Sequence, residues 1–171
     1  VYKFTGQGDE RRIIAGTIDS GVLNIGDEVV FYPSGKRSRV KTIEGFNLPE
    51  QTQAVAGQST GFTMEEQIYV TRGETATIVG QQKPRVTTRI KVSLFWLGKE
   101  PFITKKEYLL KIGTVKVNVR LEEIIRIIDA STLGKEEKSE QIKRHDVAEC
   151  ILKVNKAIAF DLASEFATSS R

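Results

Sequence analysis

The stretch of sequence that best indicates the fold is residues 14–29, Ile-Ala-Gly-Thr-Ile-Asp-Ser-Gly-Val-Leu-Asn-Ile-Gly-Asp-Glu-Val. Apolar and β-branched residues occur there in short runs, and Gly, Asp, Asn and Ser separate the runs as they do at turns. The pattern predicts strands at 12–18, 21–23 and 28–32. Residues 24–27 form the turn before the last of these, where Gly26 can supply a positive φ.

The same spacing continues on both sides of this stretch. A turn at 33–36 is followed by a predicted strand at 37–44, so that residues 29–32 and 39–43 can pair as an antiparallel hairpin. Further strands are predicted at 59–64, 75–79, 87–96, 107–112, 115–121, 122–128, 146–154 and 157–163. Paired isoleucines in 122–128 would also suit a helix, but their β-branching favours a strand. The polar segment 133–144 is expected to be a long exposed loop or a short helical turn. The chain is therefore predicted to be all-β, built as barrels or sandwiches.

A linker is predicted at residues 80–85, Gly-Gln-Gln-Lys-Pro-Arg, because the segment lacks a core residue and contains both Gly and Pro. We place the domain boundary near Pro84, which gives two small domains at 1–84 and 85–171. Each is long enough to bury a core of its own.

Composition excludes several classes of protein. The 171 residues are 39% hydrophobic and carry a net charge of +4, which excludes a disordered or collagen-like chain. One cysteine, Cys150, and one histidine, His145, give neither an internal disulfide nor a zinc cluster. No run of 18 apolar residues occurs, so we expect a soluble cytoplasmic fragment with no membrane contact. The basic surplus is smaller than that of a dedicated nucleic-acid-binding protein.

We predict no catalytic, cofactor-binding or metal-binding residues. Gly35-Lys36 resembles the end of a phosphate loop, but a valine stands where the first glycine belongs and a strand follows. His145 is expected in an exposed loop, Cys150 as a buried structural thiol, and Trp96 in a core or domain interface. Glu65 and Glu66 are adjacent, which on a strand would send their carboxylates to opposite faces.

A possible partner-binding face lies at the densest basic run. Its members are Lys36, Arg37, Arg39 and Lys41, and period-two spacing puts the last three on one face of the predicted strand. They could bind phosphate groups or an acidic protein surface. The alternative interpretation is that they only keep an outward face of the hairpin solvated.

The opening stretch also resembles the second domain of the translation-factor GTPase superfamily. Gly57-Gln58-Ser59-Thr60-Gly61 resembles the superfamily's Gly-Asp-Asn-Val-Gly strand start, and residues 68–74 resemble its Arg-Gly segment. Within the superfamily the chain is most similar to the GTPase subunit of bacterial sulfate adenylyltransferase. That likeness rests on 33–35, 66–74 and 92–101, and continues through 108–119, 128–133 and 147–162.

The resemblance implies two translation-factor-type β-barrels in tandem, domains two and three, with the second lacking its last strand and leaving an exposed edge. It implies that GTP and magnesium bind in a preceding domain with no counterpart here, so the fragment alone should be inactive. In that family GTP hydrolysis is coupled to adenylylation of sulfate by a small partner subunit, and some relatives carry a fused adenylylsulfate kinase. Two alternatives stay open: an elongation factor that binds aminoacyl-tRNA, and a β-barrel module with no GTPase attached.

Overall fold

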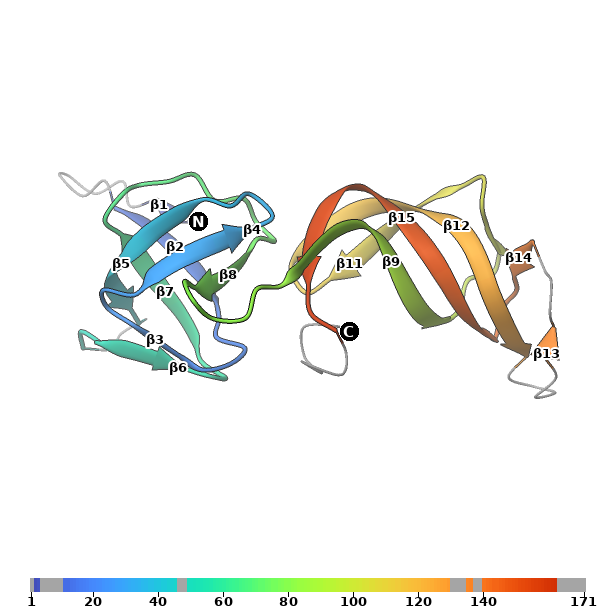
Figure 1. Ribbon diagram of the computed structural model, residues 1–171. Helices are drawn as coiled ribbons and strands as arrows, with labels where there is room; N and C mark the ends of the chain where they lie inside the picture. Colours follow the sequence, from blue (N-terminus) through green and yellow to red (C-terminus); the bar gives the residue numbers. More distant parts are fainter. Residues whose placement is uncertain (1, 4–10, 46–48, 130–134, 137–139, 163–171) are drawn as a thin grey trace. The chain divides into compact units, whose positions relative to one another are not determined.

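The computed structural model describes residues 2–3, 11–45, 49–129, 135–136 and 140–162 (Figure 1). None of these residues lies in a helix, so the described part contains no helix long and apolar enough to cross a membrane. The all-β prediction is confirmed. The chain divides into two compact units: the first is built mainly from the residues up to Val86 and also includes Ile112–Thr114 and the end of the chain from Ala159, and the second comprises Thr87–Lys111 and Val115–Ile158.

The first unit is an antiparallel sheet of six strands in the order β1-β2-β7-β5-β4-β8, with a separate two-stranded sheet, β3-β6. The strands are β1 (Tyr2–Lys3), β2 (Arg12–Thr17), β3 (Val22–Asn24), β4 (Glu28–Tyr32), β5 (Arg37–Glu44), β6 (Gln53–Val55), β7 (Ser59–Met64) and β8 (Thr75–Ile78). Within the described residues the hydrogen-bonded order runs as an open path from β1 to β8.

One hydrophobic core holds this first unit together. Val29, Phe31 and Val40 are each at most 2% exposed, and the rings of Phe31 and Phe62 stack with their centroids 6.4 Å apart. Ala54 reaches the same core from the small sheet. Burying side chains of this size stabilises the unit by about 1.5–3 kcal/mol each, before the entropy of ordering the chain is subtracted.

The turn at residues 24–27 forms as predicted. Gly26 has a φ of 90°, and the Asn24 amide donates to Asp27 Oδ2 at 2.8 Å. The predicted hairpin of β4 and β5 is antiparallel, but its register differs: Glu28 pairs with Arg39 and Val30 with Arg37. The Phe31 amide donates to Lys36 O, so pairing starts immediately at the turn, and residues 40–44 pair with β7 on the other side instead.

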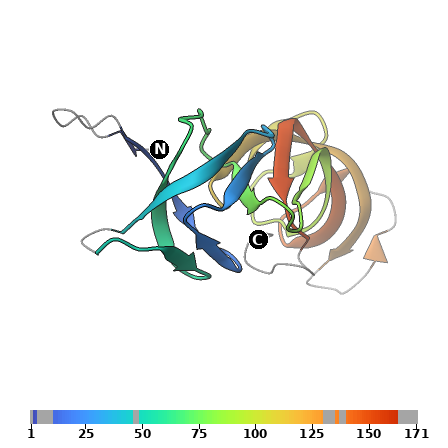
Figure 2. The ribbon, with the colours of Figure 1, turned by 60° about the vertical axis from the view of Figure 1, so that its left-hand side comes forward.

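The second unit is built on four main strands in the order β11-β12-β15-β9, with β13 beside β12 and a small β10-β14 sheet. The strands are β9 (Arg85–Phe95), β10 (Phe102–Ile103), β11 (Glu107–Ile112), β12 (Val115–Asp129), β13 (Lys135–Glu136), β14 (Gln141–Ile142) and β15 (Asp146–Phe160). Figures 1 and 2 show that β12 and β15 curve strongly along their length.

Two strand predictions in this unit were wrong about where strands end. Residues 115–121 and 122–128 belong to the single strand β12, and β15 runs without interruption through residues 155–156. Register shifts at Leu121/Glu123 and Ile124/Arg126 let β12 bend while it stays paired with β15. These bulges interrupt the period-two pattern, which made one strand look like two.

The segment 133–144 also differs from its prediction. Among its described residues, Lys135–Glu136 form β13 and Gln141–Ile142 form β14, and Ile142 is completely buried, so the segment is neither wholly an exposed loop nor a helical turn. The other residues of the segment, 133–134 and 137–139, lie outside the described part. Ile142 pairs with Phe102, which lies far away in the sequence. The polarity of the residues around Ile142 therefore could not reveal this contact.

Trp96 is half-buried and packs within the second unit against two other aromatic rings. Its ring lies 4.8 Å from that of Phe102 and meets the Tyr108 ring edge-on at 5.8 Å. The indole nitrogen donates to Glu100 O at 2.8 Å, and Tyr108 Oη accepts the Ile103 amide at 2.9 Å. The indole N–H of Trp96 and the hydroxyl of Tyr108 therefore both have hydrogen-bond partners.

Candidate functional site

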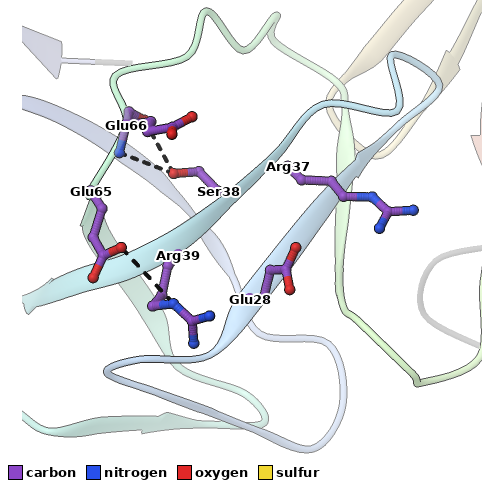
Figure 3. A pocket seen from close by; sticks show the side chains of 6 residues that line it. All are labelled: Glu28, Arg37, Ser38, Arg39, Glu65 and Glu66. Atoms are coloured by element: carbon purple, nitrogen blue, oxygen red, sulfur yellow. Dashed lines mark hydrogen bonds and ion pairs between the residues drawn. The ribbon is translucent and has the colours of Figure 1, made fainter.

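The candidate site is the outer face of β5 in the first unit (Figure 3). Arg37, Arg39 and Lys41 are exposed, while Ser38 and Val40 between them are buried at 7% and 1% exposure. Because side chains alternate along a strand, Arg37 and Arg39 share one face, as the spacing predicted, whereas a register shift between Val40 and Thr42 interrupts the alternation at the exposed Lys41. The buried alternate residues attach this face to the core below it.

Lys36, in the turn before β5, is held by a neighbouring segment. Its Nζ donates to the backbone oxygen of Tyr69 at 2.5 Å and lies 5.4 Å from the centre of the Tyr69 ring. Ser34 in the same turn donates to Glu74 Oε2 at 2.6 Å. The ammonium group is thus largely committed to internal contacts, although the Tyr69 ring itself is 69% exposed.

Arg39 is also partly committed. Its Nη1 donates to Gly26 O at 2.6 Å, and its Nε lies 3.9 Å from Glu65 Oε2. Both side chains of this ion pair are more than half exposed, so the pair contributes little to folding. Its effect is to fix the direction of the guanidinium.

Beside these charges lies a shallow polar hollow of about 240 Å³. This is below the roughly 300–1,000 Å³ of typical small-molecule sites, and its lining is polar rather than apolar. The residues that line it are Glu28, Arg37, Ser38, Arg39, Glu65 and Glu66. Such a hollow suits one or two charged side chains of a protein surface better than an enclosed ligand.

Ser38 organises the rim of the hollow. Its Oγ donates to Glu66 O and accepts the Glu66 amide, both at 3.2 Å, while the Glu65 amide donates to Arg39 O at 2.9 Å. These bonds hold the two residues after β7 against β5. Glu65 and Glu66 both follow β7, which ends at Met64, so the expectation for two adjacent carboxylates on a strand does not apply to them; both residues line the hollow.

The face is mixed in charge rather than purely basic. Three glutamates and two arginines are among the residues that line the hollow. Among the described residues, no carboxylate lies within ion-pair distance of Arg37 or Lys41. Glu28, Glu65 and Glu66 line the hollow together with Arg37, whereas Lys41 is not among its lining residues.

The remaining candidate residues lie in the second unit. His145 is exposed in a turn, and Cys150 is fully buried, as predicted. Burial raises the pKa of the Cys150 thiol to about 11, so it is protonated and unreactive at neutral pH. Within the part of the chain that the structure describes, no group of three His, Cys, Asp or Glu side chains is arranged to hold a metal ion.

Comparison with known proteins first defines the class. Residues 89–171 match the family described as GTP-eEF1A C-terminal domain-like. The fold is similar to sup35 complexed with GDP, with a TM-score of 0.82 at 16% identity, covering 98% of this chain and 41% of that chain. The chain thus shares its all-β fold with part of that protein.

A more specific likeness follows from relatives named sulfate adenylyltransferase subunit 1. The protein of Shewanella woodyi is 33% identical over 150 residues, which are 88% of this chain and 31% of that protein. The protein of Alteromonas mediterranea is 35% identical over 122 residues, 71% of this chain and 26% of that protein. The chain is therefore homologous to sulfate adenylyltransferase subunit 1 through most of its own length, and it spans about a third of these relatives.

Proposed function

We propose that this chain is the two-barrel part of a GTP-dependent sulfate adenylyltransferase subunit 1, working in the cytoplasm in sulfate activation. It couples GTP binding and hydrolysis in a preceding domain to adenylylation of sulfate by a partner subunit. The observation that supports this most is the continuous homology through both units, since a shared barrel alone would not match 88% of the chain. Translation-factor-type domains two and three are assigned to residues 1–84 and 85–171.

In this proposal GTP and magnesium bind outside these residues, and the chain alone neither hydrolyses GTP nor activates sulfate. The role of the chain is binding and coupling. The full-length parent protein either carries a fused adenylylsulfate kinase or lacks one. Coupling requires contacts whose free energies differ between the GTP-bound and GDP-bound states. Two compact β units joined by a short connection suit rigid-body rearrangement of this kind.

The face of β5 is proposed to contact the partner. Arg37 and Lys41 would pair with carboxylates of the small adenylyltransferase subunit, while Lys36 and Arg39 hold the surrounding segments in place. Charges at the rim of an interface act chiefly on association rate and on salt dependence. Binding should therefore weaken as salt is raised.

The second candidate is an elongation factor that binds aminoacyl-tRNA, favoured by the match of residues 89–171 to the GTP-eEF1A C-terminal domain-like family. Titration calorimetry of the chain against purified small subunit and against aminoacylated tRNA separates the two functions. We expect binding to the small subunit alone. Binding to tRNA with a steep salt dependence, and none to the small subunit, would favour the elongation factor instead.

The face itself is tested by Arg37→Glu, with Lys116→Glu as the matched control on an exposed position of β12. Arg37→Glu should weaken association with the small subunit about tenfold, mainly through a slower association rate. The control should bind like the unmodified chain. Equal effects of the two variants would remove β5 from the interface and leave the rest of the proposal standing.

A further inference from the structure

An exposed apolar patch lies on the second unit, away from the site above in sequence. Phe95 at the end of β9 is 51% exposed, Leu97 just beyond it is 62% exposed, and Val147 at the start of β15 is 37% exposed. The ring of His145 lies against Phe95, with centroids 6.3 Å apart and planes 22° apart. These four residues are called the Phe95 patch.

Backbone hydrogen bonds join the end of β9 to the turn before β15. The Trp96 amide donates to Asp146 O at 3.0 Å, and the His145 amide donates to Trp96 O at 2.8 Å. The end of β9 and the start of β15 are therefore side by side. Phe95 precedes Trp96 and Val147 follows Asp146, and both lie on the exposed side of their strands.

A tight turn holds His145 in place. The Asp146 amide donates to Lys143 O at 3.1 Å, and Asp146 Oδ2 accepts the Lys143 amide at 2.7 Å. His145 has a φ of 76°, a conformation that residues other than glycine seldom adopt and that costs about 1–3 kcal/mol. The turn thus holds an aromatic ring against Phe95 at a position where glycine would be less strained.

Two further cations border the patch. Lys143 and Arg144 are exposed in the same turn, and no carboxylate among the described residues lies within ion-pair distance of either. The nearby Asp146 side chain is buried and accepts the Lys143 amide. The Phe95 patch is therefore apolar at its centre and positively charged at its rim, which is the layout of a protein docking surface.

We propose that the Phe95 patch binds an acidic segment of another protein, with an aliphatic or aromatic side chain of that segment seated on Phe95, Leu97 and Val147. Its carboxylates pair with Lys143 and Arg144. A second copy of this chain is a poorer occupant, because a two-fold contact would bring like charges together. Nucleic acid is also poorer, because Leu97 and Val147 are aliphatic and offer no ring on which a base can stack. This inference does not depend on the proposed function.

The probes are fluorescein-labelled dodecapeptides that each contain four glutamates and two residues chosen from Leu, Phe and Trp, in varied order. Fluorescence anisotropy with the full chain measures their affinity. At least one peptide should bind with a Kd below about 1 mM at low salt, and more weakly at high salt. Its counterparts with lysine for glutamate, or serine for the apolar residues, should not bind.

Two matched pairs of variants locate the binding. Leu97→Ser should weaken the peptide about fivefold, whereas Leu109→Ser, at a position 58% exposed on β11, should not. Arg144→Glu should weaken it about tenfold, and Lys111→Glu should not. All four positions are exposed, so loss of folding does not confuse the result. Three results would overturn the proposal. They are no binding by any peptide, an equal loss of peptide affinity in the control variants, and tighter binding of a single-stranded oligonucleotide that competes with the peptide.

Discussion

Replacing Ser38 by alanine tests whether one hydroxyl organises the β5 face. Ser38 is 7% exposed and forms two hydrogen bonds with the Glu66 backbone, one as donor and one as acceptor, both at 3.2 Å. The methyl group of alanine can do neither. The substitution therefore removes both bonds between Ser38 and the Glu66 backbone, while the bond from the Glu65 amide to Arg39 O remains.

The expected loss follows from these contacts. A hydrogen bond of this kind contributes about 0.5–1.5 kcal/mol net, and leaving a buried partner unsatisfied costs about 1–3 kcal/mol. Water can reach the exposed Glu66 side of the contact, so we expect about 1–2 kcal/mol for Ser38→Ala. Ser59→Ala is the matched control, since Ser59 is exposed and its Oγ lies 3.4 Å from Thr17 Oγ1. The control should change stability by less than about 0.5 kcal/mol.

Urea unfolding followed by far-ultraviolet circular dichroism measures the free energy, and amide hydrogen exchange measured by NMR locates the change. In Ser38→Ala the Glu66 amide should exchange faster than in the unmodified chain, because its acceptor is gone. Equal stability losses for Ser38→Ala and Ser59→Ala, with unchanged exchange at Glu66, would refute the role given to Ser38.

Three other predictions concern single positions. Arg126 and Lys91 hold the pKa of Glu149 below its ordinary value. Their ion pairs with Glu149 therefore stabilise the fold above the unfolded-state pKa of Glu149, and this stabilisation is lost as pH falls through the folded-state pKa. NMR titration should show a higher pKa for Glu149 in Arg126→Gln. Gly61→Ala should destabilise by about 1–3 kcal/mol in thermal unfolding, because a β-carbon there would lie 2.6 Å from a side-chain carbon of β2, whereas Gly16→Ala meets no atom within 4 Å. Cys150 should react with iodoacetamide only in denaturant, and fast native labelling would contradict its burial.

Local pattern was sufficient for much of the fold. The spacing along β5 predicted that Arg37, Arg39 and Lys41 would be exposed, and the turn at residues 24–27 predicted a positive φ at Gly26. Both properties depend on neighbours in the sequence. Strand ends in the second unit were not predictable in the same way. The bulges in β12 follow from how it pairs with β15, and that pairing joins residues far apart in the chain.

The candidate site was only half predictable for the same reason. The basic residues share one strand, but the carboxylates that turn the face into a mixed-charge hollow come from β4 and from the residues after β7. Likewise, nothing near His145 in sequence indicates Phe95, its stacking partner across the β9–β15 contact. Sequence reasoning found the parts of each surface that lie on one element and missed those that tertiary pairing adds.

Under the proposed function, this chain transmits nucleotide state to sulfate activation. The most direct test measures pyrophosphate release from ATP and GTP hydrolysis in one reaction, using the full-length parent with its small subunit, with and without sulfate. The account predicts that sulfate raises both rates together and that deleting residues 1–171 uncouples them. GTP hydrolysis that does not respond to sulfate would contradict the account.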